Sequence, residues 1–144
     1  MNSSTDENRP GAQTPVDLTR AEALHLLSTV SYGRVVFTRN ALPAIRPVTH
    51  LLDGDEIIIR TRLSAKVAIA VDPGTVVAYE VDQIDPVQRL GWSVVVTGTA
   101  RQIIEPDRLA RYEKLLTPWV DLAMDVAVGI QADLVTGIRF GGAG

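Results

Sequence analysis

Cysteine is absent from this chain of 144 residues, and histidine occurs only twice, at His25 and His50. Without cysteine there is no disulfide framework, no thiolate nucleophile and no cysteine-ligated metal or iron–sulfur cluster. The two histidines fall on separate predicted elements without the spacing of metal ligands, so the sequence indicates no metal site. The glycine patterns of a dinucleotide-binding turn, a phosphate-binding P-loop and a hydrolase nucleophile elbow are also missing.

Long apolar runs and strong net charge are missing too. No apolar run reaches the ~18 residues that cross a bilayer, and the polar residues 1–15 lack the apolar core of a secretory signal. The net charge of −3 and the pI of about 5.3 argue against a general coat for nucleic acid. We therefore expect a cytoplasmic protein with no membrane or nucleic-acid partner.

The length and composition indicate one domain preceded by a tail. With 46% hydrophobic and 22% charged residues, the chain is typical of globular proteins. Residues 1–16 are rich in Ser, Thr, Asn, Pro and Gly and are predicted to be a disordered tail. The remaining residues, 17–144, are enough for one domain with its own core.

The predicted elements are mainly strands, with helices before and between them. A first helix begins near Thr19, which has capping-box spacing to Glu22, and ends near Val30. Further helices are predicted over residues 64–71, 105–120 and 120–128. The predicted strands cover residues 33–38, 42–52, 56–61, 75–82, 92–104 and 133–140. Because strands follow one another instead of alternating with helices, we expect a mainly β (α+β) fold, a six-stranded antiparallel barrel with flanking helices.

Two kinds of residue interrupt the predicted strands. Pro43 and Pro47 remove donors from the second strand, which places that strand at an edge, at a bulge or where the missing donor faces something other than a strand. Gly98 lies inside the long fifth strand and indicates a bulge or a close backbone approach.

A basic β-hairpin is predicted over residues 42–61, with Asp53-Gly54-Asp55 as its turn because Gly54 can adopt positive φ. The hairpin and the residues after it carry fixed cations and hydroxyls: Arg46, Thr49, Arg60, Thr61, Arg62, Ser64 and Lys66. Such a set suits a phosphate held beside a sheet, with the start of the helix at Lys66 assisting. The alternative is that these are ordinary solvated charges of surface strands and of a helix.

Four other side chains are considered as site residues. His50 shares a strand face with Arg46 by the period of two and is a candidate site residue; alternatively it faces solvent or a dimer partner. His25 reads as a helix-surface or core residue. Trp92 offers a flat surface and one donor to a ligand, or it is a core or interface residue. Ser93 could give a hydroxyl to a ligand edge.

These features together resemble the pyridoxamine 5'-phosphate oxidase-like family, the flavin-binding split β-barrels. The resemblance extends from Leu18 to Phe140 and rests on an ordered set of short motifs instead of one specific motif. The motifs are Gly33-Arg34-Val35, Leu42-Pro43-Ala44-Ile45-Arg46-Pro47-Val48, Asp53-Gly54-Asp55, Arg60-Thr61, Lys66, Gly91-Trp92-Ser93-Val94-Val95-Val96-Thr97-Gly98 and Val135-Thr136-Gly137.

The resemblance implies a homodimer with two cofactor sites at the subunit interface. Residues on the second strand would run along the flavin ring and ribityl chain, namely Arg46, Pro47, Val48 and Thr49. The phosphate would be held by Arg60, Thr61, Ser64 and Lys66. Trp92 and Ser93 would contact the cofactor from the partner subunit.

Two departures from the family pattern bear on activity. Ala65 stands where the oxidases tend to carry a second basic residue before the lysine, and the residues before Gly144 lack their C-terminal Arg/His segment. The sequence therefore does not indicate synthesis of pyridoxal phosphate. Relatives of this short type include proteins that bind the deazaflavin F420 and some that bind haem. The 12 arginines against two lysines hint at a GC-rich genome, where F420 is common.

The leading hypothesis is an oxidoreductase dependent on FMN, or alternatively on F420, that transfers hydride to a small organic substrate. His50 and Tyr79 are candidate proton donors. A second hypothesis is a non-catalytic protein that binds or stores flavin, F420 or haem. A third is an interaction dimer without cofactor, which the missing charge at Ala65 would permit.

Overall fold

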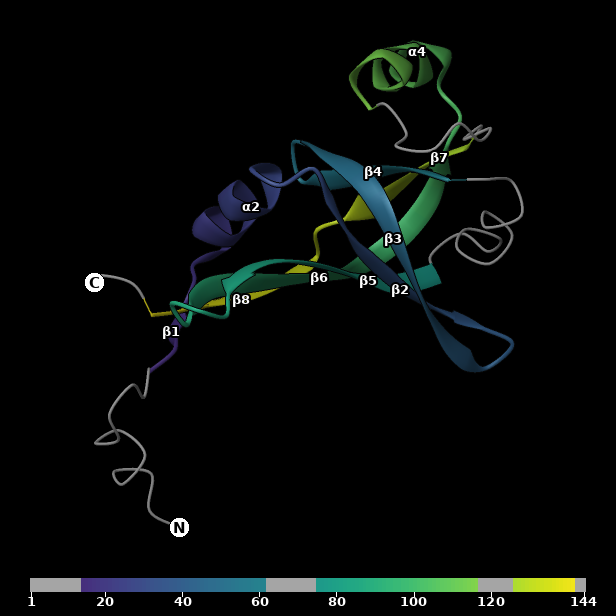
Figure 1. Cartoon of the computed structure of the whole chain (residues 1–144). Helices are drawn as coiled ribbons and strands as arrows, with labels where there is room; N and C mark the ends of the chain where they lie inside the picture. Colours follow the sequence, from purple (N-terminus) through teal and green to yellow (C-terminus); the bar gives the residue numbers. More distant parts are fainter. Residues whose placement is uncertain (1–13, 62–74, 117–125, 142–144) are drawn as a thin grey trace.

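The structure is a computed structural model of the chain, and it describes residues 14–61, 75–116 and 126–141 (Figure 1). Eight strands and two helices lie in these ranges. In chain order they are β1 (Val16–Asp17), α2 (Arg20–Ser28), β2 (Tyr32–Arg39), β3 (Leu42–Asp53), β4 (Glu56–Thr61), β5 (Thr75–Asp85), β6 (Leu90–Ile103), α4 (Pro106–Leu115), β7 (Val126–Gln131) and β8 (Leu134–Phe140).

Six of the strands close into an antiparallel barrel. The order is β6-β5-β2-β3-β4-β7, and β7 pairs again with β6 to complete the ring. β8 pairs with the first half of β6 outside this ring, and the short β1 pairs with β8. The prediction of a mainly β fold with a six-stranded antiparallel barrel and flanking helices is confirmed. The expected domain start at residue 17 falls inside β1.

The sixth barrel strand is not the one predicted. A helix was expected over residues 120–128, but Val126–Gln131 form strand β7 between β4 and β6. The predicted closing strand exists as β8, outside the ring. The error has a physical reason: five of the six β7 residues are buried, so the alternation that marks a half-exposed strand is missing. The helix predicted over residues 64–71 lies outside the described residues.

Gly98 marks the place where β6 changes partner. β6 pairs with β8 up to Thr97 and with β7 from Ala100 onward. A Cβ atom at Gly98 would overlap the carbonyl oxygen of Gln131, the last residue of β7. Glycine therefore lets the chain turn from β7 into β8 directly against β6, and the predicted close backbone approach is confirmed.

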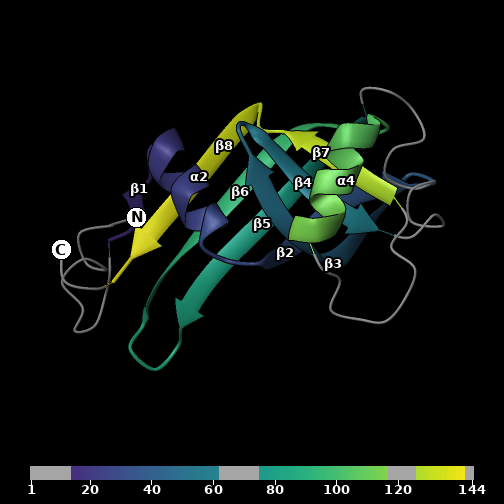
Figure 2. The same ribbon diagram turned by 90° about the horizontal axis from the view of Figure 1, so that it is seen from above.

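Helix α2 packs onto the barrel core and is capped as predicted. The Thr19 hydroxyl accepts from the Glu22 N–H at 3.1 Å, and the Glu22 carboxylate accepts from the Thr19 N–H at 2.8 Å. Ala23, Leu24 and Leu27 of this helix are buried in the main core cluster. Figures 1 and 2 show α2 over the part of the sheet that contains β6 and β8.

Helix α4 covers a second, smaller cluster on the outside of the barrel. This cluster consists of Ile58, Ile103, Tyr112, Leu116 and Ala127. Ile58 lies between two neighbours on β4, Ile57 and Ile59, that are also fully buried; β4 is therefore enclosed on both faces. Neither described helix is long and apolar enough to cross a membrane.

Candidate functional site

Within the described ranges, strand β3 has a neighbouring strand on one side only for most of its length. Residues 42–49 pair with β2, whereas β4 pairs only with His50–Asp53. Among the residues that the structure describes, no strand pairs with the other side of residues 42–49, which we call the β3 edge. An edge of this kind presents backbone N–H and C=O groups to a ligand or to another chain.

The prolines of β3 fit this edge. The His50 N–H donates to the Ser31 carbonyl at 3.0 Å, on the β2 side. Because backbone N–H and C=O groups alternate in direction along a strand, those of the odd-numbered residues of β3 point away from β2. Pro43 and Pro47 are both odd-numbered, so neither removes a hydrogen bond of the β2–β3 ladder. Thr49 keeps its N–H and C=O at the edge. Of the three positions expected for these prolines, the described residues show the strand edge.

The four predicted cofactor residues of β3 differ in exposure. Arg46 and Pro47 are exposed, whereas Val48 and Thr49 are half-buried. Val48 packs against the main core cluster. The β3 edge therefore combines an exposed cation with a strand that is anchored in the core.

Strand β4 brings two more predicted residues to the end of this edge. The last pair between β3 and β4 joins His50 to Ile59. Arg60 and Thr61 follow at the point where the two strands separate, and the same register would place Arg60 opposite Thr49. The fold thus places Arg60 and Thr61 just beyond the last β3–β4 pair, near the Thr49 end of the β3 edge.

Arg60 and Thr61 have different surroundings. Arg60 is half-buried, and its Nη1 donates to the carbonyl oxygen of Leu116 at 3.1 Å, beside the end of α4. Thr61 is buried and pairs with Val126 of β7. Nothing in the sequence pointed to Leu116, because that contact joins segments 56 residues apart. Ser64 and Lys66, the other two predicted phosphate residues, lie outside the described residues.

His50 and Tyr79 form a buried pair behind the β3 edge. His50 is 5% exposed, and its Nδ1 lies 2.6 Å from the Tyr79 hydroxyl while its Nε2 lies 3.0 Å from the Leu27 carbonyl. Burial lowers the pKa of His50 and raises that of Tyr79. His50 therefore faces neither solvent nor a partner, contrary to the alternative considered above. Both candidate proton donors are core residues that tie β3 to β5 and α2.

Trp92 and Ser93 lie away from the β3 edge of the same chain. Strand β6 is separated from β3 by β5 and β2, a distance of about 14 Å across the sheet. Trp92 is 8% exposed and belongs to the main core cluster. Ser93 points to the opposite face of β6, where it pairs with Asp82 and Ile138. A single chain does not bring either residue to the β3 edge.

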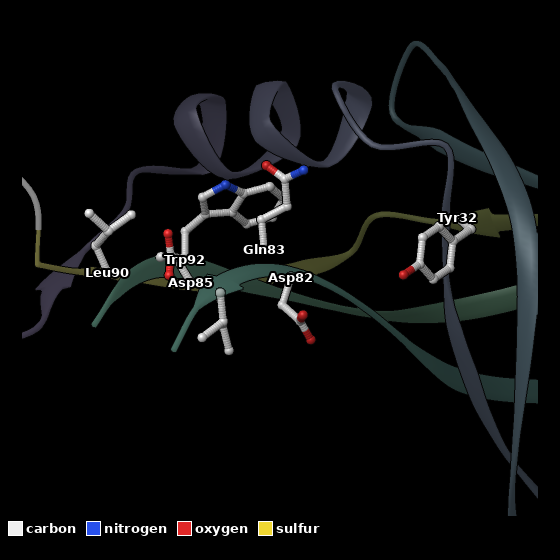
Figure 3. Close-up of a pocket in the computed structure, with 8 residues that line it drawn as sticks. Tyr32, Asp82, Gln83, Asp85, Leu90 and Trp92 are labelled. Atoms are coloured by element: carbon white, nitrogen blue, oxygen red, sulfur yellow. The ribbon is translucent and has the colours of Figure 1, made fainter. Parts of the chain in front are cut away.

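A shallow depression of about 500 Å³ lies beside Trp92 (Figure 3). It extends from Tyr32 at the start of β2 to the hairpin between β5 and β6. Its walls are Tyr32, Asp82, Gln83, Ile84, Asp85, Leu90, Gly91 and Trp92. Nothing in the sequence indicated this depression, because its walls come from strands that meet only in the folded sheet.

The carboxylates of the depression already have partners. Asp82 accepts from Arg34 Nη2 at 2.8 Å, and the Arg34 Nε donates to Glu80 at 2.7 Å. Asp85 accepts from the backbone N–H groups of Val87 and Gln88, both at 3.0 Å. Arg34 is therefore neutralised within the sheet and does not add to the positive charge of the β3 edge.

Comparison with known proteins agrees with this architecture. The sequence profile of the family described as pyridoxamine 5'-phosphate oxidase matches residues 19–139. The uncharacterized protein Rv0080 of Mycobacterium tuberculosis is 57% identical over 132 residues, which cover 89% of this chain and 87% of the relative.

Solved structures share the fold. A candidate pyridoxamine 5'-phosphate oxidase from Corynebacterium glutamicum is 33% identical with a TM-score of 0.76, and the match covers 88% of this chain and 98% of the other. An FAD-binding protein from Mycobacterium smegmatis is 24% identical with a TM-score of 0.68, covering 89% of this chain and all of the other. The family profile, the relative and the barrel agree, and the chain belongs to the pyridoxamine 5'-phosphate oxidase-like family of split β-barrels.

Proposed function

We propose that this protein is a flavin-binding oxidoreductase whose cofactor lies along the β3 edge, with its phosphate at Arg60 and Thr61. The observation that carries the proposal is the β3 edge, with which no described strand pairs and which ends where Arg60 leaves the β3–β4 ladder. Solved structures of the same fold from Mycobacterium smegmatis and Mesorhizobium loti are of FAD-binding proteins, which supports a flavin as the ligand.

The residues present fit such a group chemically. The polar edge of an isoalloxazine ring carries carbonyl oxygens and an N–H, which match the backbone groups of a strand edge such as those of Thr49. A phosphate needs fixed cations and hydrogen-bond donors, and the Arg60 guanidinium, next to Thr61 in β4, supplies both. FMN is the simplest ligand with both parts, and F420, whose tail also carries phosphate, is the alternative.

A bound flavin would supply hydride transfer, while the protein would bind and orient it. His50 and Tyr79 are buried and bonded to each other, so neither delivers a proton at the β3 edge. A proton needed by the reaction is therefore expected from the substrate or from water. The same observation favours the second candidate function, a flavin-binding protein without turnover. It argues against His50 as a haem ligand, because both of its ring nitrogens already have partners.

We further propose that the site is completed by a second copy of the chain. The outer face of the β8-β6-β5-β2-β3 sheet carries exposed apolar side chains that no described helix covers: Ile45, Val76, Leu134 and Ile138. Ser93 lies on this face beside Ile138. Packing of two such faces would bury apolar surface and could bring Ser93 of the partner subunit to the β3 edge.

The test is a titration of the purified protein with FMN, FAD and F420, followed by absorbance and fluorescence. Arg60→Gln should weaken binding of the phosphate-bearing cofactor by ~10-fold or more, the effect of losing one charge-assisted hydrogen bond. Arg89→Gln removes the same charge from an exposed turn and is the matched control. Binding of none of the three cofactors would remove the proposal.

Catalysis is tested separately with the loaded protein. The bound flavin is reduced anaerobically and mixed with candidate acceptors. Reoxidation at a rate that saturates with acceptor supports an oxidoreductase. Tight binding without such turnover would select the storage function.

A further inference from the structure

Helix α4 is tied to the barrel at its first turns through a buried carboxylate. Arg108 Nη2 donates to Glu56 Oε1 at 2.6 Å, and the Glu56 side chain is only 10% exposed. Glu56 Oε2 accepts from Gln131 Nε2 at 3.2 Å and lies 3.4 Å from Arg101 Nε. A Cβ atom at Gly129 would overlap this carboxylate, so the glycine provides the space for it. Glu56 is thus a fixed anchor for α4.

A second contact fastens the middle of α4 to the β3–β4 turn. The Tyr112 hydroxyl accepts from Arg108 Nη2 at 2.7 Å and donates to Asp53 Oδ2 at 2.5 Å. Arg111 also pairs with Asp53. Tyr112 is 1% exposed and packs beside Ile58 in the cluster under the helix. The helix therefore cannot shift along β4 without breaking buried polar contacts.

The other end of α4 meets Arg60. Leu116 follows the last helical residue, and its N–H donates to the Tyr112 carbonyl at 2.8 Å. Its own carbonyl oxygen accepts from Arg60 Nη1 at 3.1 Å. A cation is favoured at a helix C-terminus because the carbonyl groups there carry partial negative charge. This contact fixes the position of Nη1 of the Arg60 guanidinium.

The contacts at the two ends of α4 are about equally far apart along the helix and along β4. From Arg108 to Leu116 the helix advances eight residues, or about 12 Å. From Glu56 to Arg60 the strand advances four residues, or about 13 Å. Helix and strand therefore run between the same two ends, with Ile58 packed between them.

We propose that α4 acts as a strut that positions Arg60 for anion binding. Its positioning residues are Glu56, about 13 Å from Arg60 along β4, and Tyr112 in α4 itself. This inference rests on the proposed function, because it takes Arg60 as the phosphate-binding residue. The strut fixes the guanidinium before the ligand arrives, so less side-chain freedom is lost on binding.

The variant Glu56→Gln separates this proposal from a simple charge effect. Removing a negative charge makes the protein less repulsive to an anionic ligand, so Coulomb forces alone predict slightly tighter binding of FMN. At physiological salt the Debye length is about 8 Å, so even that effect is small. The strut predicts the opposite sign, weaker binding, because Arg60 loses its fixed orientation.

The experiment compares FMN with riboflavin, which has the same ring and no phosphate. The ratio of the two affinities reports the phosphate contact alone, whereas a general folding defect lowers both affinities. We expect Glu56→Gln to reduce this ratio by ~10-fold, the loss of one oriented charge-assisted hydrogen bond, and Tyr112→Phe to reduce it less. Glu105→Gln is the matched control, since it removes an exposed carboxylate beside the same arginines without touching β4.

A double-mutant cycle completes the test. If Glu56 acts through Arg60, then Glu56→Gln should not change the ratio further in an Arg60→Gln background. An unchanged ratio in both Glu56→Gln and Tyr112→Phe would overturn the strut, and so would an additive effect in the double variant. If Glu56→Gln does not fold, Tyr112→Phe alone decides. A wild-type ratio near one would instead refute the phosphate site, and the strut with it.

Discussion

His50 makes the stability of this protein sensitive to acid. A carbonyl oxygen can only accept, so the 3.0 Å contact to Leu27 assigns the ring proton to Nε2, and Nδ1 accepts from the Tyr79 hydroxyl. The imidazole is therefore neutral in the folded protein, and its burial lowers the pKa of His50. In the unfolded chain the same side chain has an ordinary pKa near 6.5.

The sign and size of the effect follow from linkage. Because the folded-state pKa is the lower one, the contribution of His50 is fully present above pH 6.5 and is lost as the pH falls toward the folded-state pKa. At pH 5.5, protonation of His50 in the unfolded chain lowers the free energy of unfolding by at most about 1.4 kcal/mol. The loss is smaller if Tyr79 turns its proton toward the Val48 carbonyl, 3.4 Å away, and accepts from a charged His50.

The assay is urea unfolding at pH 7.5 and 5.5, at fixed protein concentration, followed by tryptophan fluorescence. The background variant His25→Gln removes the exposed histidine of α2, so that His50 is the one histidine left. Its free energy of unfolding should fall between the two pH values, by up to about 1.4 kcal/mol. The double variant with His50→Gln should show a smaller fall. Equal stability of the His25→Gln protein at both pH values would refute a buried neutral His50.

Other predictions concern the elements that shape the barrel. Gly98→Ala should lower the free energy of unfolding by about 3 kcal/mol or prevent folding, because its Cβ overlaps the Gln131 carbonyl. Gly54→Asn should be tolerated, since a Cβ at Gly54 meets nothing within 4 Å and Asn accepts positive φ. Equal melting temperatures of the two variants would contradict this. Thr19→Ala should lower the free energy of unfolding, measured with urea, by about 1 kcal/mol, because α2 loses its N-cap. An unchanged free energy would show that the capping box of Thr19 and Glu22 does not stabilise α2.

The sequence predicts local structure well where a residue type favours one particular backbone position, such as a helix cap or a tight turn. Thr19 and Glu22 at capping spacing give the start of α2, and Asp53-Gly54-Asp55 gives the turn between β3 and β4. Pro43 and Pro47 limit their part of β3 to an edge, a bulge or a missing partner, and the described strands show the edge. Each of these signals depends on a few neighbouring residues and on backbone chemistry that tertiary contacts do not override.

Contacts between distant segments could not be predicted in the same way. The period of two places His50 on one face of β3, but it does not say which face is inside the barrel. β7 lost its alternation because strands and α4 enclose it. The bond from Arg60 to Leu116 depends on where α4 docks, and that depends on Glu56 and Asp53, whose partners on α4 lie more than 50 residues away.

The central claim is the location of the cofactor along the β3 edge. It is tested most directly by two-dimensional amide NMR of the isotope-labelled protein during titration with FMN. The account predicts that the largest chemical-shift changes occur at Arg46, Val48, Thr49, Arg60 and Thr61. Changes confined to the depression between Tyr32 and Trp92, with the β3 edge unaffected, would contradict it.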